Sequence, residues 1–367
     1  MVVKKLHLID FRNYKEEKLE FDDGINVIVG SNAQGKTSLI EAIYYLASAR
    51  SFRLASDKEM ISLGHDASVI KIDMISGGRN QTLEARFFRG RRREIYINGA
   101  KLKALSELAG KLTAVPFSPD DLGMVKDSAV VRRKMMDQCL SQLRPGYLAA
   151  ITEFNRLYNH KSRILRDYRE KPSLLELLDD YNLRMAHQSA RIIYYRSSFV
   201  NALSNKAADI HQGFSDGEDV LEIRYKTVGG MQTFGKKPEQ LLPDLLEHQR
   251  EHRNAELQSG LCLSGIHKDD LEIDINGVAA RKFASQGQAR TVVISIKLAE
   301  RDMHFNNSGE YPLLLLDDVL SELDAKRQNF VLEKINNGQV FITCCDERAA
   351  RVSPNSRIIH IKNGSVI

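Results

Sequence analysis

This chain is organised around an octapeptide near its N-terminus, Gly30-Ser31-Asn32-Ala33-Gln34-Gly35-Lys36-Thr37. It fits the pattern G-x-x-x-x-G-K-[ST] at every required position, and this pattern is typical of a phosphate-binding loop. The apolar run 25–29 before it predicts a buried strand, and the spacing of Leu39, Ile43 and Leu46 after it predicts a helix. The alternative is a chance match in a glycine-containing loop, which the flanking strand and helix disfavour. The octapeptide therefore predicts an α/β protein with a nucleotide site.

The residue types of this loop match the chemistry of a triphosphate. Gly30 and Gly35 allow the backbone to turn its N–H groups toward phosphate oxygens. Lys36 is expected to place its charge at the β- and γ-phosphates, and Thr37 to offer its hydroxyl to Mg²⁺. The helix that follows adds the favourable end of its dipole. We therefore expect ATP and Mg²⁺ as ligands.

A second acidic site lies near the other end of the chain, in the segment 312–324. An uninterrupted apolar run predicts a central parallel strand, and Asp317 stands at its carboxyl end. Asp317 is expected to hold Mg²⁺, and Asp318 to polarise the attacking water. The alternative is two acids that cap a turn. With Lys36 they form the predicted catalytic set, and the separation of 317 − 36 = 281 residues predicts a large insertion.

A third element, Ser285-Gln286-Gly287-Gln288, precedes a helix-like stretch at 291–300. Before it, the alternating run 271–275 ends in Asn276-Gly277, which predicts a hairpin. A serine at a helix start is by itself most often an ordinary N-cap. Between a phosphate loop and an acidic strand end, however, the segment favours an ABC-type signature with a second anion-binding helix end.

Seven segments, in this order along the chain, resemble those of the RecF family of bacterial recombination mediators, which are ABC ATPases related to SMC and Rad50. The segments are Phe11–Tyr14, Gly30–Thr37, Phe117–Leu122, Arg132–Arg133, Gly265–Leu271, Ser285–Gln288 and Asp317–Asp324. The resemblance implies an α/β fold with a two-lobed ABC-type P-loop ATPase head and an inserted short helical arm domain. The signature and the acidic segment are specific, whereas the phosphate loop alone is not.

The resemblance also implies an ATP-driven homodimer. Ser285 to Gln288 of one subunit would close over the triphosphate held by Gly30 to Thr37 of the other. Arg12 would contact the nucleotide, and Ser321 and Asp324 would belong to the D-loop. The implied partners are double-stranded DNA, single-strand/double-strand junctions, the mediators RecR and RecO and, through them, RecA. The implied role is recombinational repair and replication restart, with slow hydrolysis as the release step.

Several positions depart from the family's pattern. Ile266 and Lys268 stand where proline and arginine are usual, and a lysine cannot make a bidentate phosphate contact. Asp318 stands where many ABC ATPases have glutamate, which favours slow hydrolysis. No histidine follows the apolar run 340–343, so Thr343 is our interpretation for the γ-phosphate sensor.

The motifs divide the chain into two parts. Residues 1–118 and 262–367 are predicted to form a discontinuous head, and 119–261 a mainly helical arm domain. Helices are expected over 154–169 and 174–199, with a break at 171–173. No sustained heptads are present, which argues against the long coiled coil of an SMC or Rad50 protein.

Three basic clusters are candidates for contact with DNA phosphates. They are Arg89, Arg91, Arg92 and Arg93; Lys161, Arg163 and Arg166, followed by Arg169; and Arg132, Arg133 and Lys134. The alternative for each cluster is a solvated charged face, and for Arg132 and Arg133 also a structural or nucleotide-linked role. No helix-turn-helix or zinc finger is apparent, so recognition of DNA shape is favoured over recognition of sequence.

Composition excludes several classes of protein. The 367 residues carry a net charge of 53 − 48 = +5, too small a surplus to establish nucleic-acid binding. Four cysteines without paired spacing indicate neither a disulfide framework nor a zinc site, and the absence of a long apolar run argues against a membrane partner. We expect a cytoplasmic protein. The alternative functions are an SMC-like ATPase that bridges DNA, a P-loop small-molecule kinase, and a nuclease fused to an ABC head.

Overall fold

A computed structural model describes residues 1–53, 56–215, 218–345 and 356–367. The chain forms two compact units, the first of residues 1–123 with 286–367 and the second of residues 124–285. The expected return to the head at residue 262 is therefore wrong for 262–285. These residues belong with the second unit because strand β10 (Asp270–Ile275) pairs in antiparallel fashion with β9 (Leu221–Lys226).

The first unit contains a six-stranded sheet in the order β15-β14-β3-β13-β12-β8. Its five longer strands are parallel, and only β15 runs antiparallel to its neighbour. The strands are β3 (Ile25–Val29), β8 (Ala114–Phe117), β12 (Leu313–Asp317), β13 (Val340–Cys344), β14 (Arg357–Lys362) and β15 (Ser365–Val366). Strand β3 thus confirms the predicted buried strand, and β12 confirms the predicted central parallel strand. Because parallel strands end at one edge, residues after β3 and β12 meet there.

A second sheet of this unit is antiparallel, in the order β2-β1-β4-β5-β6-β7. Its strands are β1 (Val2–Phe11), β2 (Tyr14–Glu20), β4 (Ala67–Ser76), β5 (Arg79–Phe88), β6 (Glu94–Ile97) and β7 (Ala100–Lys101). Alternate residues of β4 are buried, as a half-buried strand requires. Asn98 and Gly99, both at positive φ, form the turn between β6 and β7.

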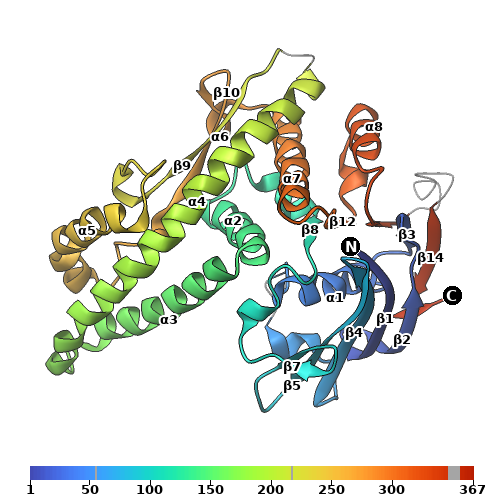
Figure 1. Ribbon diagram of the computed structural model, residues 1–367, viewed down its shortest axis with the longest axis horizontal. Coiled ribbons are helices and arrows are strands. Elements are labelled where there is room, and N and C mark those ends of the chain that lie inside the picture. The colour runs from blue at the N-terminus through green and yellow to red at the C-terminus, as the bar shows by residue number, and fades with distance from the viewer. Residues whose placement is uncertain (54–55, 216–217, 346–355) are drawn as a thin grey trace. The chain divides into compact units, whose positions relative to one another are not determined.

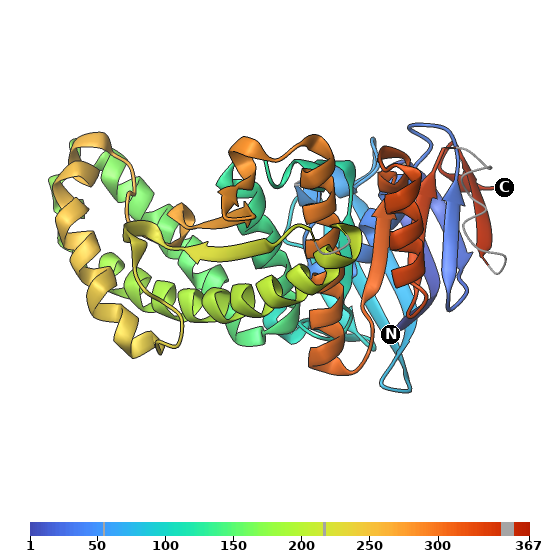
Figure 2. The ribbon, with the colours of Figure 1, turned by 90° about the horizontal axis from the view of Figure 1, so that it is seen from above.

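Helix α1 (Lys36–Ser48) contacts strands of both sheets, β8, β12 and β13 in one and β4 and β5 in the other. Its apolar residues therefore share one core with both sheets, and Leu39, Ile43 and Leu46 are fully buried. Helices α7 (Gln286–Ser308) and α8 (Ala325–Lys334) lie side by side in the same unit (Figure 2). No helix within the described residues is both long and apolar enough to cross a membrane.

The second unit is mainly helical (Figure 1). Its helices are α2 (Ala129–Leu143), α3 (Pro145–Asp167), α4 (Leu178–Ser215), α5 (Pro238–Ser259) and α6 (Ala280–Phe283). Helix α4 packs against α3, α5 and β9, and the short strand β11 (Val278–Ala279) completes the sheet β11-β10-β9.

The break predicted at 171–173 is confirmed, since a 3-10 helix spans Pro172–Leu177 between α3 and α4. Both helices are longer than expected. Pro145 at the first position starts α3 earlier, and the buried residues Leu203, Ala207 and Phe214 continue the apolar spacing of α4. The 38 residues of α4 span about 57 Å at 1.5 Å per residue.

Candidate nucleotide-binding site

The octapeptide forms the connection between β3 and α1, at the carboxyl edge of the parallel sheet. Gly35 is the N-cap of α1 at φ 115°, and Ala33 also has a positive φ of 64°. A glycine cap has no side chain to accept from the first N–H groups, and the first turn of α1 contains no acidic residue. These N–H groups therefore face the position where a phosphate would bind, as the pattern predicts.

The turn between β1 and β2 supports the phosphate loop through two hydrogen bonds. Asn13 Nδ2 donates to the carbonyl oxygen of Gln34 at 3.1 Å, and the Tyr14 hydroxyl donates to that of Gly35 at 3.0 Å. A Cβ at Gly35 would lie 2.6 Å from Asn13 Nδ2, so Gly35 is required for space as well as for its positive φ. Burial raises the pKa of Tyr14, which keeps its hydroxyl a donor. The sequence analysis gave no role to Asn13 or Tyr14 beyond the resemblance.

Lys36 is almost fully buried and turns back over its own loop. Its Nζ donates to the carbonyl oxygens of Gly30 and Ser31 at 2.8 and 3.3 Å, and lies 3.8 Å from Asp318 Oδ2. Cys345 Sγ, which the sequence analysis did not connect to the site, is 3.3 Å from the same Nζ. The ammonium group is thus held between the loop and the acidic strand end.

Thr37 and Asp317 form the predicted metal-binding pair. Thr37 Oγ1 donates to Asp317 Oδ1 at 3.0 Å, which brings together two oxygen ligands from positions 280 residues apart. Oxygen donors of this kind are those that Mg²⁺ prefers, so the residues fit the ion. Burial, together with the neighbouring Asp318 carboxylate, raises the pKa of Asp317 against the lowering effect of the hydrogen bonds from Thr343 and Thr37.

Thr343 at the end of β13 is a positioning residue of this pair. Its hydroxyl donates to Asp317 Oδ1 at 2.9 Å and accepts from the backbone N–H of Asp318 at 2.8 Å. The side chain is 1% exposed and its hydroxyl is engaged by Asp317 and Asp318, which does not favour the interpretation of Thr343 as a γ-phosphate sensor. Asp318 itself has a positive φ of 53° and is one-third exposed, which leaves its carboxylate at the mouth of the site.

A pocket of about 500 Å³ surrounds the loop. Arg12, Lys36, Thr37 and Asp318 all line it, and they are four of the seven predicted site residues that share this cavity. The guanidinium of Arg12 is fixed by the buried Glu41 of α1, with Nε and Nη2 at 3.0 and 2.9 Å from its two oxygens. The remaining lining includes Asn13, Asn32, Ala33, Gly35, Ser38, Arg53, Glu59, Ile61 and Leu63.

The predicted signature lies at the start of α7, where Ser285 and Gln286 are exposed. Arg327 of α8 donates to the carbonyl oxygen of Gly287 at 3.0 Å and is also paired with Asp324. Asp324 is the N-cap of α8, accepting from the backbone N–H of Arg327 at 3.0 Å, and Ser321 donates to the carbonyl oxygen of Asp318. Among the described residues that line the phosphate-loop pocket, none belongs to the signature.

Comparison with known proteins agrees with this arrangement. Residues 2–365 match the model of the RecF/RecN/SMC N terminal domain. The DNA replication and repair protein RecF of Acetivibrio thermocellus is 36% identical over 347 residues, which are 95% of this chain and 94% of the relative. This chain belongs to the RecF family.

Solved RecF structures support the same assignment. The recombination mediator protein RecF-ATPrS in the RecFOR pathway matches with a TM-score of 0.92 and 30% identity, over 99% of this chain and 97% of that chain. The RecF-ATP structure of the same pathway matches with a TM-score of 0.90 and 30% identity, over 100% and 97%. The predicted fold class, an ABC-type α/β ATPase head with an inserted helical part, is thereby confirmed.

Within this RecF-family fold the first basic cluster occupies the turn between β5 and β6. Arg91 pairs with Glu94 at 3.1 Å and stacks over Phe88, and Arg93 pairs with Asp57 at 2.7 Å. Arg89 donates to the carbonyl oxygens of Ser62 and His65, while Arg92 is exposed. The cluster therefore stays a candidate for DNA contact, and Arg92 forms neither an ion pair nor a hydrogen bond within the described residues.

The second cluster is only partly on the surface. Lys161 is fully buried in α3 and pairs with the buried Glu256 of α5 at 2.7 Å. Its prediction as a DNA contact is wrong, because α5 covers that face of α3. Arg163 and Arg166 are exposed on the opposite face and stay candidates.

Arg132 and Arg133 serve the structure of the second unit, in agreement with the alternative given for them. Arg132 is buried and forms a bidentate pair with Asp270 at 2.7 and 2.9 Å, while Arg133 donates to the carbonyl oxygen of Asp269. Asp269 is also fully buried, and Arg196 of α4 donates to it at 3.1 Å. Sequence reasoning missed Arg196, whose only signal was an arginine within an otherwise apolar helix face.

Proposed function

We propose that this chain is a RecF-type, ATP-dependent DNA-binding protein with slow ATPase activity. In this proposal ATP binding joins two copies on double-stranded DNA near a single-strand gap, and hydrolysis releases them. The single observation that carries it is the constellation of Lys36, Thr37 and Asp317 at one edge of the parallel sheet. The solved RecF-ATP structure, which this chain resembles over its whole length, supports ATP as the nucleotide.

Different residues of the site have different roles in ATP hydrolysis. The loop N–H groups and Lys36 hold the triphosphate, and Lys36 exchanges its loop carbonyl contacts for phosphate oxygens. Thr37 and Asp317 hold Mg²⁺, which neutralises charge that develops on the phosphate oxygens. Asp318, at the mouth of the pocket, orients the attacking water and accepts its proton. Its side chain is shorter than glutamate, which supports a slow reaction.

The base and sugar of the nucleotide have an apolar contact surface in the same pocket. Ile61 and Leu63 line it beside the phosphate loop, and Leu63 is 98% exposed. An exposed leucine at the rim of a polar pocket gains from contact with a flat aromatic base.

The proposal of a dimer depends on the predicted signature, which does not line the pocket of its own chain. Ser285 to Gln288 do not line it, although their exposed position at the start of α7 suits contact with a phosphate. We place this segment over the triphosphate of a second copy. ADP lacks the γ-phosphate, so the contact weakens after hydrolysis and nucleotide state controls association.

The cellular role rests on the relatives. Their names, DNA replication and repair protein and recombination mediator of the RecFOR pathway, support action with RecO and RecR. We further propose that this action helps to load RecA at gapped DNA. The clusters Arg89–Arg93 and Arg163–Arg166 are our candidates for phosphate contact.

A complementation experiment tests the shared site. We expect Lys36→Met and Ser285→Arg to abolish ATP-dependent dimers when each is measured alone by mass photometry. A mixed dimer, however, contains one pocket with an intact Lys36 opposite an intact Ser285, so mixing the two variants is expected to restore dimers and hydrolysis. Asn306→Arg, an exposed substitution on the same helix, serves as the matched control. Two variants that fail to complement each other, while Asn306→Arg behaves as the unmodified chain, would refute the shared site.

A further inference from the structure

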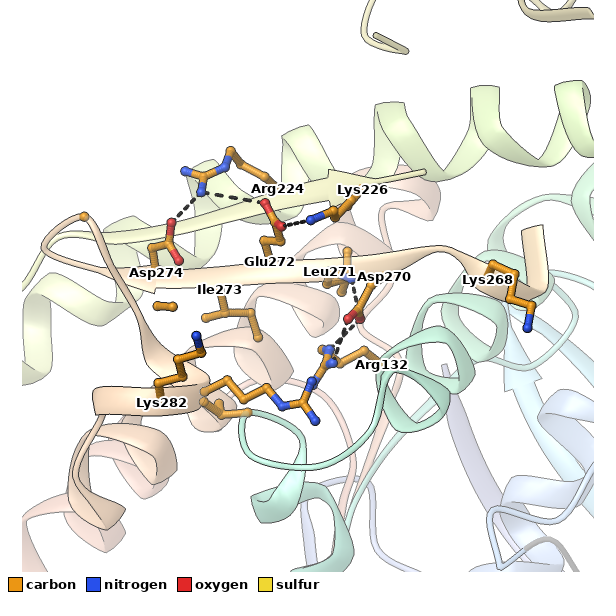
Figure 3. A pocket seen from close by; sticks show the side chains of 14 residues that line it. Arg132, Arg224, Lys226, Lys268, Asp270, Leu271, Glu272, Ile273, Asp274 and Lys282 are labelled. Carbon is orange, nitrogen blue, oxygen red and sulfur yellow. Dashed lines mark hydrogen bonds and ion pairs between the residues drawn. The ribbon is translucent and has the colours of Figure 1, made fainter. Parts of the chain in front are cut away.

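A second cleft, of about 650 Å³, lies within residues 124–285 along strand β10. We call it the β10 cleft. Its walls are the strands β9 and β10, the segment at the start of α2, and helix α6 (Figure 3). The charged residues that line it are Arg132, Arg224, Lys226, Lys268, Arg281, Lys282, Asp270, Glu272 and Asp274.

The carboxylates of the β10 cleft are each neutralised from within it. Asp270 pairs with Arg132, Glu272 with Lys226 at 2.6 Å, and Asp274 with Arg224. Asp270, Glu272 and Asp274 are alternate residues of β10, and Figure 3 shows the pairs that they form. Each carboxylate of the cleft is therefore already paired with a cation, and little negative charge remains to neutralise the other cations that line it.

Three cations of the β10 cleft stay uncompensated. Lys268, Arg281 and Lys282 are exposed, and none forms an ion pair within the ranges that the structure describes. Six cations against three carboxylates leave the cleft with an excess of three positive charges. In Figure 3, Lys268 and Lys282 lie toward opposite ends of β10, so the excess charge is spread along the strand.

The lining favours phosphate groups over a peptide. Leu271 and Ile273 contribute to the wall, but their side chains are 3% and 6% exposed. Peptide recognition relies on buried apolar anchors, and this cleft offers little apolar surface for them. Spaced cations along an open cleft match the regular charges of a nucleic-acid backbone.

The β10 cleft is connected through the chain to the signature. Arg281 and Lys282 belong to α6, which ends at Phe283, and Ser285 follows two residues later. Lys126, from the segment before α2, donates from its Nζ to the carbonyl oxygen of Ala284. A ligand held by Arg281 and Lys282 therefore acts on the short segment that carries Ser285.

We propose that the β10 cleft binds the phosphate backbone of double-stranded DNA through Lys268, Arg281 and Lys282, and that this contact positions Ser285 for ATP-dependent dimerisation. The proposal rests on the proposed function. DNA would then promote dimers because the same four-residue helix contacts the backbone on one side and leads into the signature on the other.

The binding test compares two triple variants by fluorescence anisotropy with a labelled blunt duplex in the presence of ATP. Lys268→Gln/Arg281→Gln/Lys282→Gln removes the excess charge of the cleft. Lys171→Gln/Arg191→Gln/Lys237→Gln removes the same charge elsewhere on the second unit, at exposed residues to which no DNA contact is assigned. For the cleft variant we expect roughly tenfold or greater weakening, and a slope of log affinity against log salt that is less steep by about one per lost contact. Equal behaviour of the two variants would overturn the assignment.

The coupling test measures dimer formation by mass photometry, with ATP alone and with ATP plus duplex. The cleft variant is expected to dimerise normally with ATP alone and to lose the stimulation by duplex. Stimulation that survives in the cleft variant would refute the coupling. If the unmodified chain dimerises with ATP but binds no duplex, both the proposed DNA function and the cleft assignment fail. Cleft-dependent binding of an oligo-glutamate peptide, with duplex binding unchanged, would identify an acidic protein partner instead.

Discussion

Arg327 donates from Nη2 to the carbonyl oxygen of Gly287 at 3.0 Å and so ties the start of α8 to the start of α7. The same guanidinium donates from Nε to Thr291 Oγ1 at 2.9 Å and pairs with the N-cap Asp324. The segments predicted to be the D-loop and the signature, which the sequence presents as separate motifs, are therefore held by one side chain. We expect movement of either segment to be transmitted to the other.

Arg327→Ala is expected to weaken ATP-dependent dimerisation roughly tenfold, because charge-assisted hydrogen bonds of this kind contribute about 1.5–3 kcal/mol. ATP binding to the monomer should be unchanged, since Arg327 does not line the phosphate-loop pocket. Mass photometry and a nucleotide-binding titration separate the two effects. Lys334→Ala at the exposed end of the same helix is the control, and an equal effect of both variants would contradict the proposed connection.

Asp317→Asn tests the predicted metal pair. The substitution keeps the size of the side chain but removes the charge that attracts Mg²⁺ beside Thr37. We expect binding of MgATP to weaken at least roughly tenfold, and binding of ATP in the presence of a chelator to change little. A fluorescent ATP analogue measured with and without Mg²⁺ gives both values. Equal losses in the two conditions would show that Asp317 acts on the fold and not on the metal.

Leu63→Ser tests the contact with the nucleotide base. Removing an exposed leucine leaves the stability of the chain unchanged, because its side chain buries almost no surface in the absence of ligand. The apolar area that a bound base would cover contributes about 1–2 kcal/mol, so ATP affinity should fall roughly tenfold. Inorganic triphosphate, which has no base, should bind both forms equally. Equal losses for ATP and triphosphate would refute the assignment.

Lys161→Met is expected to destabilise the second unit by about 3–5 kcal/mol, because it leaves Glu256 buried without its partner. The double variant Lys161→Met/Glu256→Gln should recover most of that stability, since it removes both charges and keeps an oxygen that accepts from the backbone N–H groups of Leu263 and Ser264. Urea unfolding measures the difference. DNA affinity of the folded double variant should equal that of the unmodified chain, and a selective loss of DNA binding would restore Lys161 as a contact.

The half-buried His267 predicts a pH dependence of stability. Burial lowers its pKa to about 4, and its Nδ1 has no hydrogen-bond partner within the described residues. Because the unfolded chain binds a proton with an ordinary pKa of about 6.5, it takes up more protons than the folded chain between these values. The free energy of unfolding is therefore highest above about pH 6.5, and it decreases by roughly 2–3 kcal/mol as the pH drops toward 4.

Urea unfolding across that pH range measures the effect. His267→Asn removes the titrating ring and should show a shallower decline. His187→Asn, an exposed histidine on α4, is the matched control and should leave the curve unchanged. A curve for His267→Asn as steep as that of the unmodified chain would assign the pH dependence to other groups.

Local sequence patterns predicted the elements of the nucleotide site well. The loop 30–37, strands β3 and β12 and the start of α7 all lie where spacing and composition placed them, because each is defined by residues close together in the chain. The pairing of Thr37 with Asp317 was also predictable, since parallel strands end at a common edge.

Contacts between distant segments were not predictable from such patterns. Lys161 had the appearance of a surface charge on an amphipathic helix, and only the packing of α5 shows its pairing with Glu256. Thr343 follows a strand at a position that suits a sensor, yet its hydroxyl is used to hold Asp317. The end of the inserted unit was misplaced because the pairing of β10 with β9 joins residues about 50 positions apart.

The position of β3 in the parallel sheet has a consequence for biosynthesis. Both of its neighbours, β13 and β14, are encoded at the far end of the chain, so 339 − 29 = 310 residues must follow β3 before the first neighbour begins. At about 5–20 residues per second, a translating ribosome needs roughly 15–60 seconds for that distance. Throughout this time a nascent chain carries an unpaired apolar strand, which makes it a client for chaperones, and a prematurely terminated product cannot form the ATP site.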